Sequence, residues 1–346
     1  MFTLGNNLNP KLEDFTFLSI STCPSYSLFG YIYPITRDHY FIEKYSSFPP
    51  PISYLETPFW LLRTHTIKDM KNPSKLIFVA SFVFFAILIK STTAQEVEDE
   101  REFDYLQGSE KGPGHWGDLK KDWEACKNGS MQSPIDLSSK RVEVIPKLLD
   151  LKRNYKPCNA TVKNRGHDIS LKWEGDAGSI QINGTDYFLD QGHWHSPSEH
   201  SINGRRYDLE LHMVHLARDP NVTNKIAVVG LFYKIGHHDD FLSKLMRNIL
   251  SMTDKKDERN MGVIDPREIK MGGKKYYRYM GSLTVPPCTE GVIWTINKKI
   301  RTVSREQVKS LRVAVHDYAE KNARPVQQLN NREIQLYGPN PTSTRN

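Results

Sequence analysis

The sequence predicts a mainly β fold, of the α+β class, in which most of the chain forms one domain. Short runs of alternating apolar and polar residues recur with turn residues between them, and many short strands at such spacing indicate a sheet-dominated fold. No internal repeat, low-complexity linker or hinge rich in proline and glycine interrupts residues 105–340. Large sheet proteins commonly exceed about 200 residues as one unit, so we place a single domain at 105–340.

The expected elements follow the period of the apolar residues. Period-two alternation predicts strands, and apolar residues three and four positions apart predict helices. The runs predicted as strands are 168–175, 178–184, 185–195, 205–216, 224–236 and 291–300. The stretches predicted as helices are 240–252 and 304–321, the second with Ser304 as its N-cap.

Residues 70–94 have the layout of a secretory signal peptide. Met70 and two lysines precede an apolar run from Leu76 to Ile89, and small residues follow this run up to Ala94. A transmembrane helix needs about 20 apolar residues, and this run is shorter. We therefore expect cleavage after Ala94 and no stable membrane insertion of the mature chain.

The segments on either side of the signal and of the domain are predicted to lie outside the folded part. A signal peptide should begin a chain, so residues 1–69 are interpreted as a gene-model extension before the true start at Met70, or else as a genuine organellar or membrane-associated leader. Residues 95–104 are expected to form an acidic tail and residues 341–346 a disordered tail. The expected destination is the secretory pathway and the extracellular space or apoplast, with a plastid reached through the secretory route as the alternative.

A secretory route would give a function to the cysteines and to the glycosylation motifs. Three cysteines follow the signal, so an oxidised domain would contain one disulfide and one odd thiol, and spacing alone does not choose the pair. Asn183 precedes a glycine, which is also the pattern of a hairpin turn. Four N-x-S/T motifs are predicted glycosylation acceptors, and their asparagines are Asn128, Asn159, Asn183 and Asn221.

The charge of the chain argues against nucleic-acid binding. The chain has 47 basic and 40 acidic residues, for a net charge of +7, but both signs are mixed along its length. It has no basic helix with interleaved aromatic residues, which nucleic-acid binding would favour. We therefore expect no nucleic-acid partner.

The segment QGHWHSPSEH at 191–200 is rich in histidine. Alternate side chains of a strand share a face, so His193 and His195 would point the same way, roughly 6.6 Å apart along the chain. Trp194 would then lie on the opposite face. Such a pair can bind one metal ion, or it can consist of core or surface histidines with ordinary hydrogen bonds.

A third histidine is predicted to join this pair. The Asn-Gly step at 203–204 is the strongest short hairpin signal, and it would fold the next run back with Glu210 and His212 on one face. Three histidines indicate a catalytic zinc site, because structural sites have four protein ligands. Gln191 and Glu210 lie two residues from a ligand, where each can accept the outer N–H of its ring. A satisfied core cluster of histidines is the alternative.

The domain resembles an α-class carbonic anhydrase of the secreted plant kind. The resemblance implies one domain built on a large, twisted, mostly antiparallel sheet with short peripheral helices. As function it implies zinc-dependent, reversible hydration of carbon dioxide to bicarbonate and a proton, with Zn²⁺ as the cofactor. The stretches that carry it occur in the family's order and are GPGHWGDL, QSPIDL, NRGHDISL, QGHWHSPSEH, LELHMVH, KIAVVGLFYKIG, GSLTVPPCTEGVIW and ARPVQQLNNRE.

The resemblance also implies roles for individual residues. Thr284 would accept from the zinc-bound hydroxide and donate to the buried Glu199. Val285 stands where many members have a second threonine, which puts the rate and the anion affinity in question. The implied zinc ligands and the acceptors of their outer nitrogens are His193, His195, His212, Gln191, Glu210 and the backbone carbonyl of Asn322. The residues implied to lie beside the substrate are Val214, Val228, Leu283, Val285 and Trp294.

Two further sets of residues follow from the resemblance. His167 takes the position of the proton shuttle, and Asn164 and Tyr105 belong to the polar wall near it. Cys126 and Cys288 match a disulfide pair of secreted members. That disulfide would close a loop of about 160 residues, which the chain-entropy model rates at roughly 5 kcal/mol.

The alternative function is that of a non-catalytic storage or binding protein on the same scaffold. Relatives of that kind typically lack a ligand histidine or the shuttle, whereas this sequence has the three ligand histidines together with Thr284 and Glu199. A fold alone does not confer function. Zinc content measured together with carbon dioxide hydration separates the two functions.

Overall fold

The computed structural model describes residues 102–145, 151–253 and 255–338. Among these residues, no helix is both long enough and apolar enough to cross a membrane. The predicted segments that lie wholly or largely outside them are the extension at 1–69, the signal peptide at 70–94, the acidic tail at 95–104 and the C-terminal tail at 341–346.

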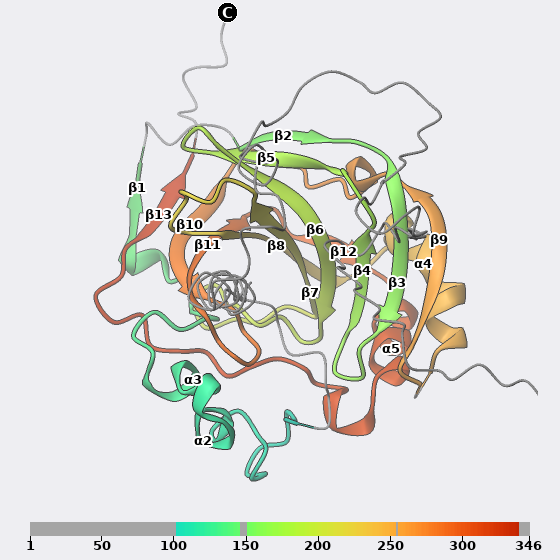
Figure 1. The fold of residues 1–346 in the computed structure, drawn as a ribbon, viewed down its shortest axis with the longest axis horizontal. Coiled ribbons are helices and arrows are strands. Elements are labelled where there is room, and N and C mark those ends of the chain that lie inside the picture. The colour runs from blue at the N-terminus through green and yellow to red at the C-terminus, as the bar shows by residue number, and fades with distance from the viewer. Residues whose placement is uncertain (1–101, 146–150, 254, 339–346) are drawn as a thin grey trace, which may run out of the picture. The chain divides into compact units, whose positions relative to one another are not determined.

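The described residues form one sheet of thirteen strands (Figure 1). The strands are β1 (Val142–Val144), β2 (Lys152–Tyr155), β3 (Cys158–Asn164), β4 (Ile169–Trp173), β5 (Gly178–Ile182), β6 (Thr185–His195), β7 (Leu209–Ala217), β8 (Ile226–Ile235), β9 (Asp257–Ile264), β10 (Tyr276–Ser282), β11 (Glu290–Asn297), β12 (Arg301–Val303) and β13 (Ile334–Tyr337). The main path through the sheet is β1-β13-β10-β11-β8-β7-β6-β4-β3-β9. Pairing is parallel between β1 and β13, β8 and β11, and β8 and β12, and antiparallel elsewhere, so the mainly antiparallel fold class is confirmed.

The helices are short and peripheral, as Figure 1 shows. The α-helices are α2 (Trp116–Leu119), α3 (Ala125–Asn128), α4 (Asp240–Ser251) and α5 (Arg305–Ala314). The 3-10 turns are η3 (Lys121–Trp123), η4 (Ser139–Arg141), η5 (Pro266–Glu268) and η6 (Asp317–Ala319).

Each of the six runs predicted as strands overlaps a strand, and the two Asn-Gly steps are turns. Asn183 and Gly184 join β5 to β6 with φ of 50° and 82°, and Asn203 and Gly204 have φ of 51° and 77°. Asparagine and glycine tolerate this left-handed backbone, which tight hairpin turns require. The strand predicted to begin at residue 205 begins at Leu209 instead, because the Asn203 turn is the tip of a longer loop between β6 and β7.

The two predicted helices form, and the second is shorter than expected. Ser304 caps α5 in a capping box, since its side chain accepts from Gln307 N and the Gln307 side chain accepts from Ser304 N. The helix ends at Ala314, well before residue 321. The next segment is extended, and His316 N donates to Gly166 O beyond the end of β3. That tertiary bond stops the helix, and helical spacing does not predict it.

Alternate residues of β8 belong to two different apolar clusters, one on each face of the sheet. Ala227 and Val229 pack in the cluster that also holds the buried side chains of α4 and α5. Val228 and Phe232 pack in the other cluster. The two helices therefore cover one face of the sheet, and the histidines described below lie on the opposite face of β7.

A third apolar cluster surrounds the disulfide and is called the N-terminal cluster. The disulfide joins Cys126 in α3 to Cys288 in the loop after β10, as the resemblance implied. Cys158 is the free cysteine of the described residues. The buried members of the cluster are Phe103, Trp116, Trp123, Cys126, Val285 and Cys288.

Candidate metal centre

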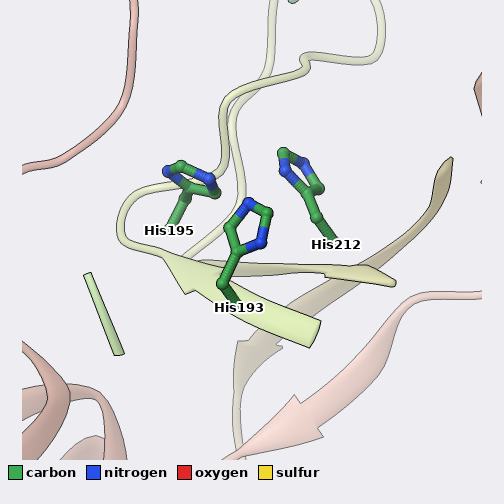
Figure 2. Close-up of side chains that lie close together, drawn as sticks. All are labelled: His193, His195 and His212. Atoms are coloured by element: carbon green, nitrogen blue, oxygen red, sulfur yellow. The ribbon is translucent and has the colours of Figure 1, made fainter. Parts of the chain in front are cut away.

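Two neighbouring strands bring three histidines together. His193 and His195 are at the end of β6, and His212 is in the middle of β7. The antiparallel register places His193 directly opposite His212, so alternation on one strand and pairing with the next carry all three side chains to one face. Figure 2 shows the three rings facing a common point.

The geometry of these histidines suits a single metal ion. One ring nitrogen from each lies within 4.8 Å of the others. The ring centroids are 5.0 Å apart for His193 and His195, 5.2 Å for His193 and His212, and 4.7 Å for His195 and His212. All three side chains are buried, and buried imidazoles without enough hydrogen-bond acceptors are unfavourable unless a metal or a proton joins them.

Each ring has an acceptor for its outer nitrogen. His193 Nδ1 donates to Gln191 Oε1 at 2.9 Å, and His195 Nδ1 donates to the backbone carbonyl of Asn322 at 2.7 Å. His212 Nε2 donates to Glu210 Oε1 at 2.9 Å. These bonds select the tautomer that presents the inner nitrogen of each ring to the common point.

The inner nitrogens match what zinc requires. His195 Nε2 is buried and has no hydrogen-bond partner among the described residues. A structural zinc site would need a fourth protein ligand, and a catalytic one keeps three and an open position. The residues present therefore fit a zinc ion bound by three imidazoles.

Burial and neighbouring charges set the protonation of the cluster. Burial holds the pKa of His193 well below its usual value and also lowers the pKa of His212. Both rings are therefore neutral at neutral pH, which is the form that binds a metal. Burial would lower the pKa of His195 as well, but the carboxylates of Glu199, Asp168 and Glu210 and the bond to the Asn322 carbonyl together outweigh burial and raise it. A proton on His195 and a metal ion would compete for the same nitrogen.

Glu199 points toward the ligands. It is fully buried; its Oε1 accepts from Arg324 N at 2.9 Å, and its Oε2 lies 3.7 Å from His195 Nε2 and 3.9 Å from His212 Nδ1. Thr284 is also buried, but within the described residues no hydrogen bond joins Thr284 to Glu199. Glu199 Oε2 faces the histidines and has no hydrogen-bond partner among the described residues.

A buried chain of hydrogen bonds behind His212 was not found by sequence reasoning. Glu210 also accepts from His200 Nδ1 at 2.8 Å, and His200 Nε2 bonds the hydroxyl of Tyr279 at 2.7 Å. His200 belongs to the histidine-rich segment QGHWHSPSEH, and this is the sequence signal that could have indicated its part in the site. Burial alone would raise the pKa of Glu210, but His200 and His212 hold it well below its usual value. Glu210 therefore stays an anion that can orient His212.

A glycine leaves room for this carboxylate. Gly230 of β8 lies opposite His212 in the sheet register. A Cβ atom at Gly230 would approach Glu210 Oε1 to 3.1 Å and Ile296 Cδ1 to 2.6 Å. Any larger residue at this position would push on Glu210 and, through it, on His212.

Four of the five residues expected beside the substrate pack in one apolar cluster, which adjoins the histidines. Trp294 is 4.8 Å from His212 between ring centroids. Val285 is the exception, because it packs in the N-terminal cluster with the disulfide. The four are Val214, Val228, Leu283 and Trp294.

A cavity of about 1020 Å³ adjoins the centre. Gln191, Val214 and Leu283 line it, together with Ser170 and Arg165. The cavity thus has both an apolar and a polar side next to the ligand partners. Its volume exceeds what carbon dioxide needs and lies at the upper end of ordinary small-molecule pockets, about 300–1,000 Å³.

The expected polar-wall residues lie away from the lining of this cavity. His167 is fully buried, with its ring centroid 5.1 Å from that of Phe103 and its Nε2 3.7 Å from Asp168 Oδ2. Tyr105 packs on the aromatic residues of the N-terminal cluster. Asn164 Nδ2 donates to backbone carbonyls at Met252 and Ala314, which anchors the end of β3.

An ion pair that sequence reasoning missed lies beside His167. Arg165 Nε donates to Asp168 Oδ1 at 2.7 Å, and both side chains are nearly or fully buried. Burial would raise the pKa of Asp168, but Arg165 holds it far below its usual value. The pair therefore remains ionised, and Arg165 is one of the residues that line the cavity.

Comparisons with known proteins agree with this geometry. The model of the eukaryotic-type carbonic anhydrase family matches residues 111–338. Alpha carbonic anhydrase 7 of Arabidopsis thaliana is 55% identical over 270 residues, which are 77% of this chain and 97% of that protein. Carbonic anhydrase Nec1 of Nesocodon mauritianus is 55% identical over 262 residues, or 75% and 93% of the two chains. The crystal structure of dioscorin complexed with ascorbate is similar with a TM-score of 0.67 at 43% identity, covering 70% of this chain and 100% of that one.

Proposed function

Because this chain belongs to the eukaryotic-type carbonic anhydrase family, we propose that it catalyses the reversible hydration of carbon dioxide to bicarbonate and a proton. The observation that carries the proposal is the set of three buried imidazoles whose outer nitrogens are all bonded to acceptors. His193, His195 and His212 would hold a zinc ion. Zinc bound by three histidines acidifies water enough to supply hydroxide at neutral pH.

The chain's own residues would prepare the substrate and the ligands. Val214 and Leu283 line the cavity next to the histidines and would hold carbon dioxide by apolar contact. Trp294 packs behind them on His212 and limits how that ring can turn. Glu199 and Thr284 would orient the attacking hydroxide once Thr284 donates to the Oε2 atom of Glu199.

His167 is our proposed carrier of the proton that each turnover releases. An imidazole with a pKa near 6.5 can take and give a proton at neutral pH. In the structure its ring packs on Phe103 and does not line the cavity. The proposed role therefore requires the ring to turn about its side-chain bonds toward the cavity during turnover.

The second candidate function is a binding protein without catalysis. The observation that favours it is the likeness to dioscorin, whose structure was determined in complex with ascorbate. The cavity of about 1020 Å³ would accept a molecule of that size. Such a protein would bind its ligand whether or not His193, His195 and His212 hold zinc.

One pair of measurements on the purified protein tests both candidates. We expect about one zinc per chain by elemental analysis and carbon dioxide hydration by stopped-flow, both lost in His195→Ala because two remaining protein ligands hold zinc poorly. The matched control is His237→Ala, an exposed histidine, which should change neither value. Full zinc occupancy in His195→Ala contradicts the ligand assignment, and zinc-loaded protein without hydration activity supports the binding function.

We also propose a secretory destination for the protein. The disulfide between Cys126 and Cys288 supports it, because disulfides form and persist in oxidising compartments. The four predicted glycosylation sites support it as well, since all four asparagines are exposed.

A further inference from the structure

Four lysines crowd one end of the strand pair β10 and β11 and are called the lysine patch. Lys274 and Lys275 precede β10, and Lys298 and Lys299 follow β11. All four are exposed. Tyr276 pairs with Asn297 across the two strands, so the two lysine pairs are neighbours in space although more than twenty positions separate them in the sequence.

Hydrogen bonds fasten the two basic segments to each other. Lys298 N donates to Lys275 O at 2.9 Å. The Asn297 side chain donates to Gly272 O at 2.8 Å and accepts from Lys299 N at 2.8 Å. Asn297 therefore ties the loop before β10 to the turn after β11, and the charges are held in a fixed arrangement instead of on two mobile loops.

Two glycines make room for one of the lysines. Gly272 and Gly273 have φ of 54° and 69°, which side chains rarely tolerate. A Cβ atom at Gly272 would lie 2.9 Å from Lys299 Nζ, and one at Gly273 would lie 3.0 Å from Lys299 Cβ. The glycine pair thus leaves room for the Lys299 side chain beside the loop that precedes Lys274.

The charges of the lysine patch have no carboxylate partner among the described residues. In the part of the chain that the structure describes, none of the four lysines forms an ion pair, and Lys298 Nζ contacts a ring, 5.6 Å from the Tyr277 centroid. Asp239 and Asp240 at the start of α4 pair with other cations, Arg301 and Lys270. Other exposed lysines do pair, namely Lys120, Lys127, Lys156 and Lys244. Unpaired like charges held side by side attract a polyanion.

We propose that the lysine patch binds a linear polymer of carboxylated sugars. Ammonium groups are compact, strongly hydrated charges that can match separate carboxylates along a chain. Single-stranded nucleic acid is disfavoured because it needs exposed aromatic rings for stacking, and Tyr276 and Tyr277 are buried. A membrane surface is disfavoured because interfacial binding uses exposed apolar side chains, and the large exposed hydrophobic side chains of the described residues belong to other segments.

The position of the lysine patch separates this binding from the metal centre. β10 has seven residues, a length of roughly 23 Å at about 3.3 Å per residue. The lysine patch lies at its start, and Thr284 follows its end. A polymer held at the patch therefore leaves the cavity open, so the protein can be retained on a polyanionic matrix while its proposed reaction continues.

Retention on immobilised polygalacturonate tests the proposal. We expect the purified protein to bind at low ionic strength and to be released by salt, because charge pairs at a surface are screened. Replacing the four lysines with glutamine should weaken binding to the polymer by about tenfold or more, since each lysine charge adds to the attraction of the polyanion. The patch variant is Lys274→Gln, Lys275→Gln, Lys298→Gln and Lys299→Gln.

A matched control removes the same charge elsewhere. It replaces four lysines that already have carboxylate partners, so net charge falls equally and binding should change less than about twofold. Equal loss in both variants, or no binding by the unaltered protein, overturns the proposal. Equal or tighter binding to single-stranded RNA or to anionic phospholipid vesicles overturns the choice of polymer. Unchanged zinc content in both variants shows that they are folded. The control is Lys120→Gln, Lys127→Gln, Lys156→Gln and Lys244→Gln.

Discussion

The three histidines proposed as zinc ligands are oriented by acceptors of three chemical kinds. Gln191 offers a neutral amide, Asn322 a backbone carbonyl, and Glu210 an anion. A carboxylate acceptor makes the ring it holds more basic and a stronger ligand than an amide does. His212 is therefore the histidine whose basicity depends most on its acceptor. This fits the several hydrogen bonds that hold the Glu210 carboxylate in place.

Loss of His167 is expected to slow proton export and little else. His167→Ala should lower the maximal hydration rate in weak buffer by about tenfold or more, while the second-order rate stays nearly intact because proton export follows product release. Stopped-flow hydration across buffer concentrations, at equal zinc content, measures both. Added imidazole should restore the rate. An unchanged maximal rate at low buffer would show that protons leave by another route. This outcome is the decisive one, because His167 is buried against Phe103 in the structure.

His215 is expected to destabilise the protein in mild acid. Its ring is buried, with Nε2 2.8 Å from the Tyr155 hydroxyl, and burial lowers its pKa from 6.5 to about 4. Between those pH values the unfolded chain binds a proton that the folded chain does not. The free energy of unfolding contributed by this site therefore falls as the pH drops from 6.5 to 4, by about 3 kcal/mol in all.

The variant His215→Gln isolates this effect. Glutamine can keep a hydrogen bond to Tyr155 but does not titrate. Urea unfolding between pH 4 and pH 7 should therefore show a smaller loss of stability in the variant than in the unaltered protein. Parallel curves for the two proteins would place the acid sensitivity at other groups.

At the residue level, the spacing of residues in the sequence predicts those contacts that depend only on one strand and the turn beside it. Alternation and the Asn-Gly turn are enough to bring the histidines of β6 and β7 together and to place Gln191 and Glu210 behind them. The surroundings of Glu199 and His167 are not predictable in this way. Arg324 reaches Glu199 from a distant segment, and Phe103 covers His167, so these contacts exist only once the whole chain is folded.

At the level of elements, the strands predicted from the sequence are β4 to β8 and β11, which have alternating or continuous burial. β2, β3, β10 and β13 were not predicted, although β3 and β10 have a similar burial pattern. β9 was not predicted either, because the first four residues of its sequence DERNMGVI are all polar, and it forms a strand by pairing with β3. β1 and β12 have three residues each, too few for a period to show. Their strand structure comes from the neighbours that offer them hydrogen bonds, and not from their own pattern.

The disulfide is expected to make a large contribution to stability. Cys126 and Cys288 are separated by 162 positions, and closing so long a loop restricts the unfolded chain by about 5 kcal/mol in the chain-entropy model. The double variant Cys126→Ser, Cys288→Ser should lower the free energy of unfolding, measured by denaturant titration, by an amount that approaches this value. Cys158→Ser, which removes the free thiol, should change it by less than about 1 kcal/mol.

A small effect of the double variant would have a structural reason. Arg324 Nη2 donates to Cys126 O, and the Gln132 side chain donates to Cys288 O, each near 3 Å. If the double serine variant loses less than about 1 kcal/mol of unfolding free energy, these hydrogen bonds hold the loop without the covalent link.

At the level of the whole molecule, the sequence predicts how the chain is processed. We expect the native protein to begin near Gln95 and to carry glycans on some of its sequon asparagines, because a signal at residues 70–94 directs the chain into the secretory pathway. Terminal sequencing, and the mass before and after glycosidase treatment, check both points. Peptides from residues 1–69 in the mature protein would exclude Met70 as the true start.

The strand order places the metal centre far from both edges of the sheet. Along the main path, β4, β3 and β9 separate β6 from one edge, and β8, β11, β10, β13 and β1 separate β7 from the other. Local opening of a sheet starts where buried contacts are few, at edge strands and chain ends. The strands that carry the ligands are therefore among the last to part, and a molecule whose edges have opened still keeps its three histidines in register.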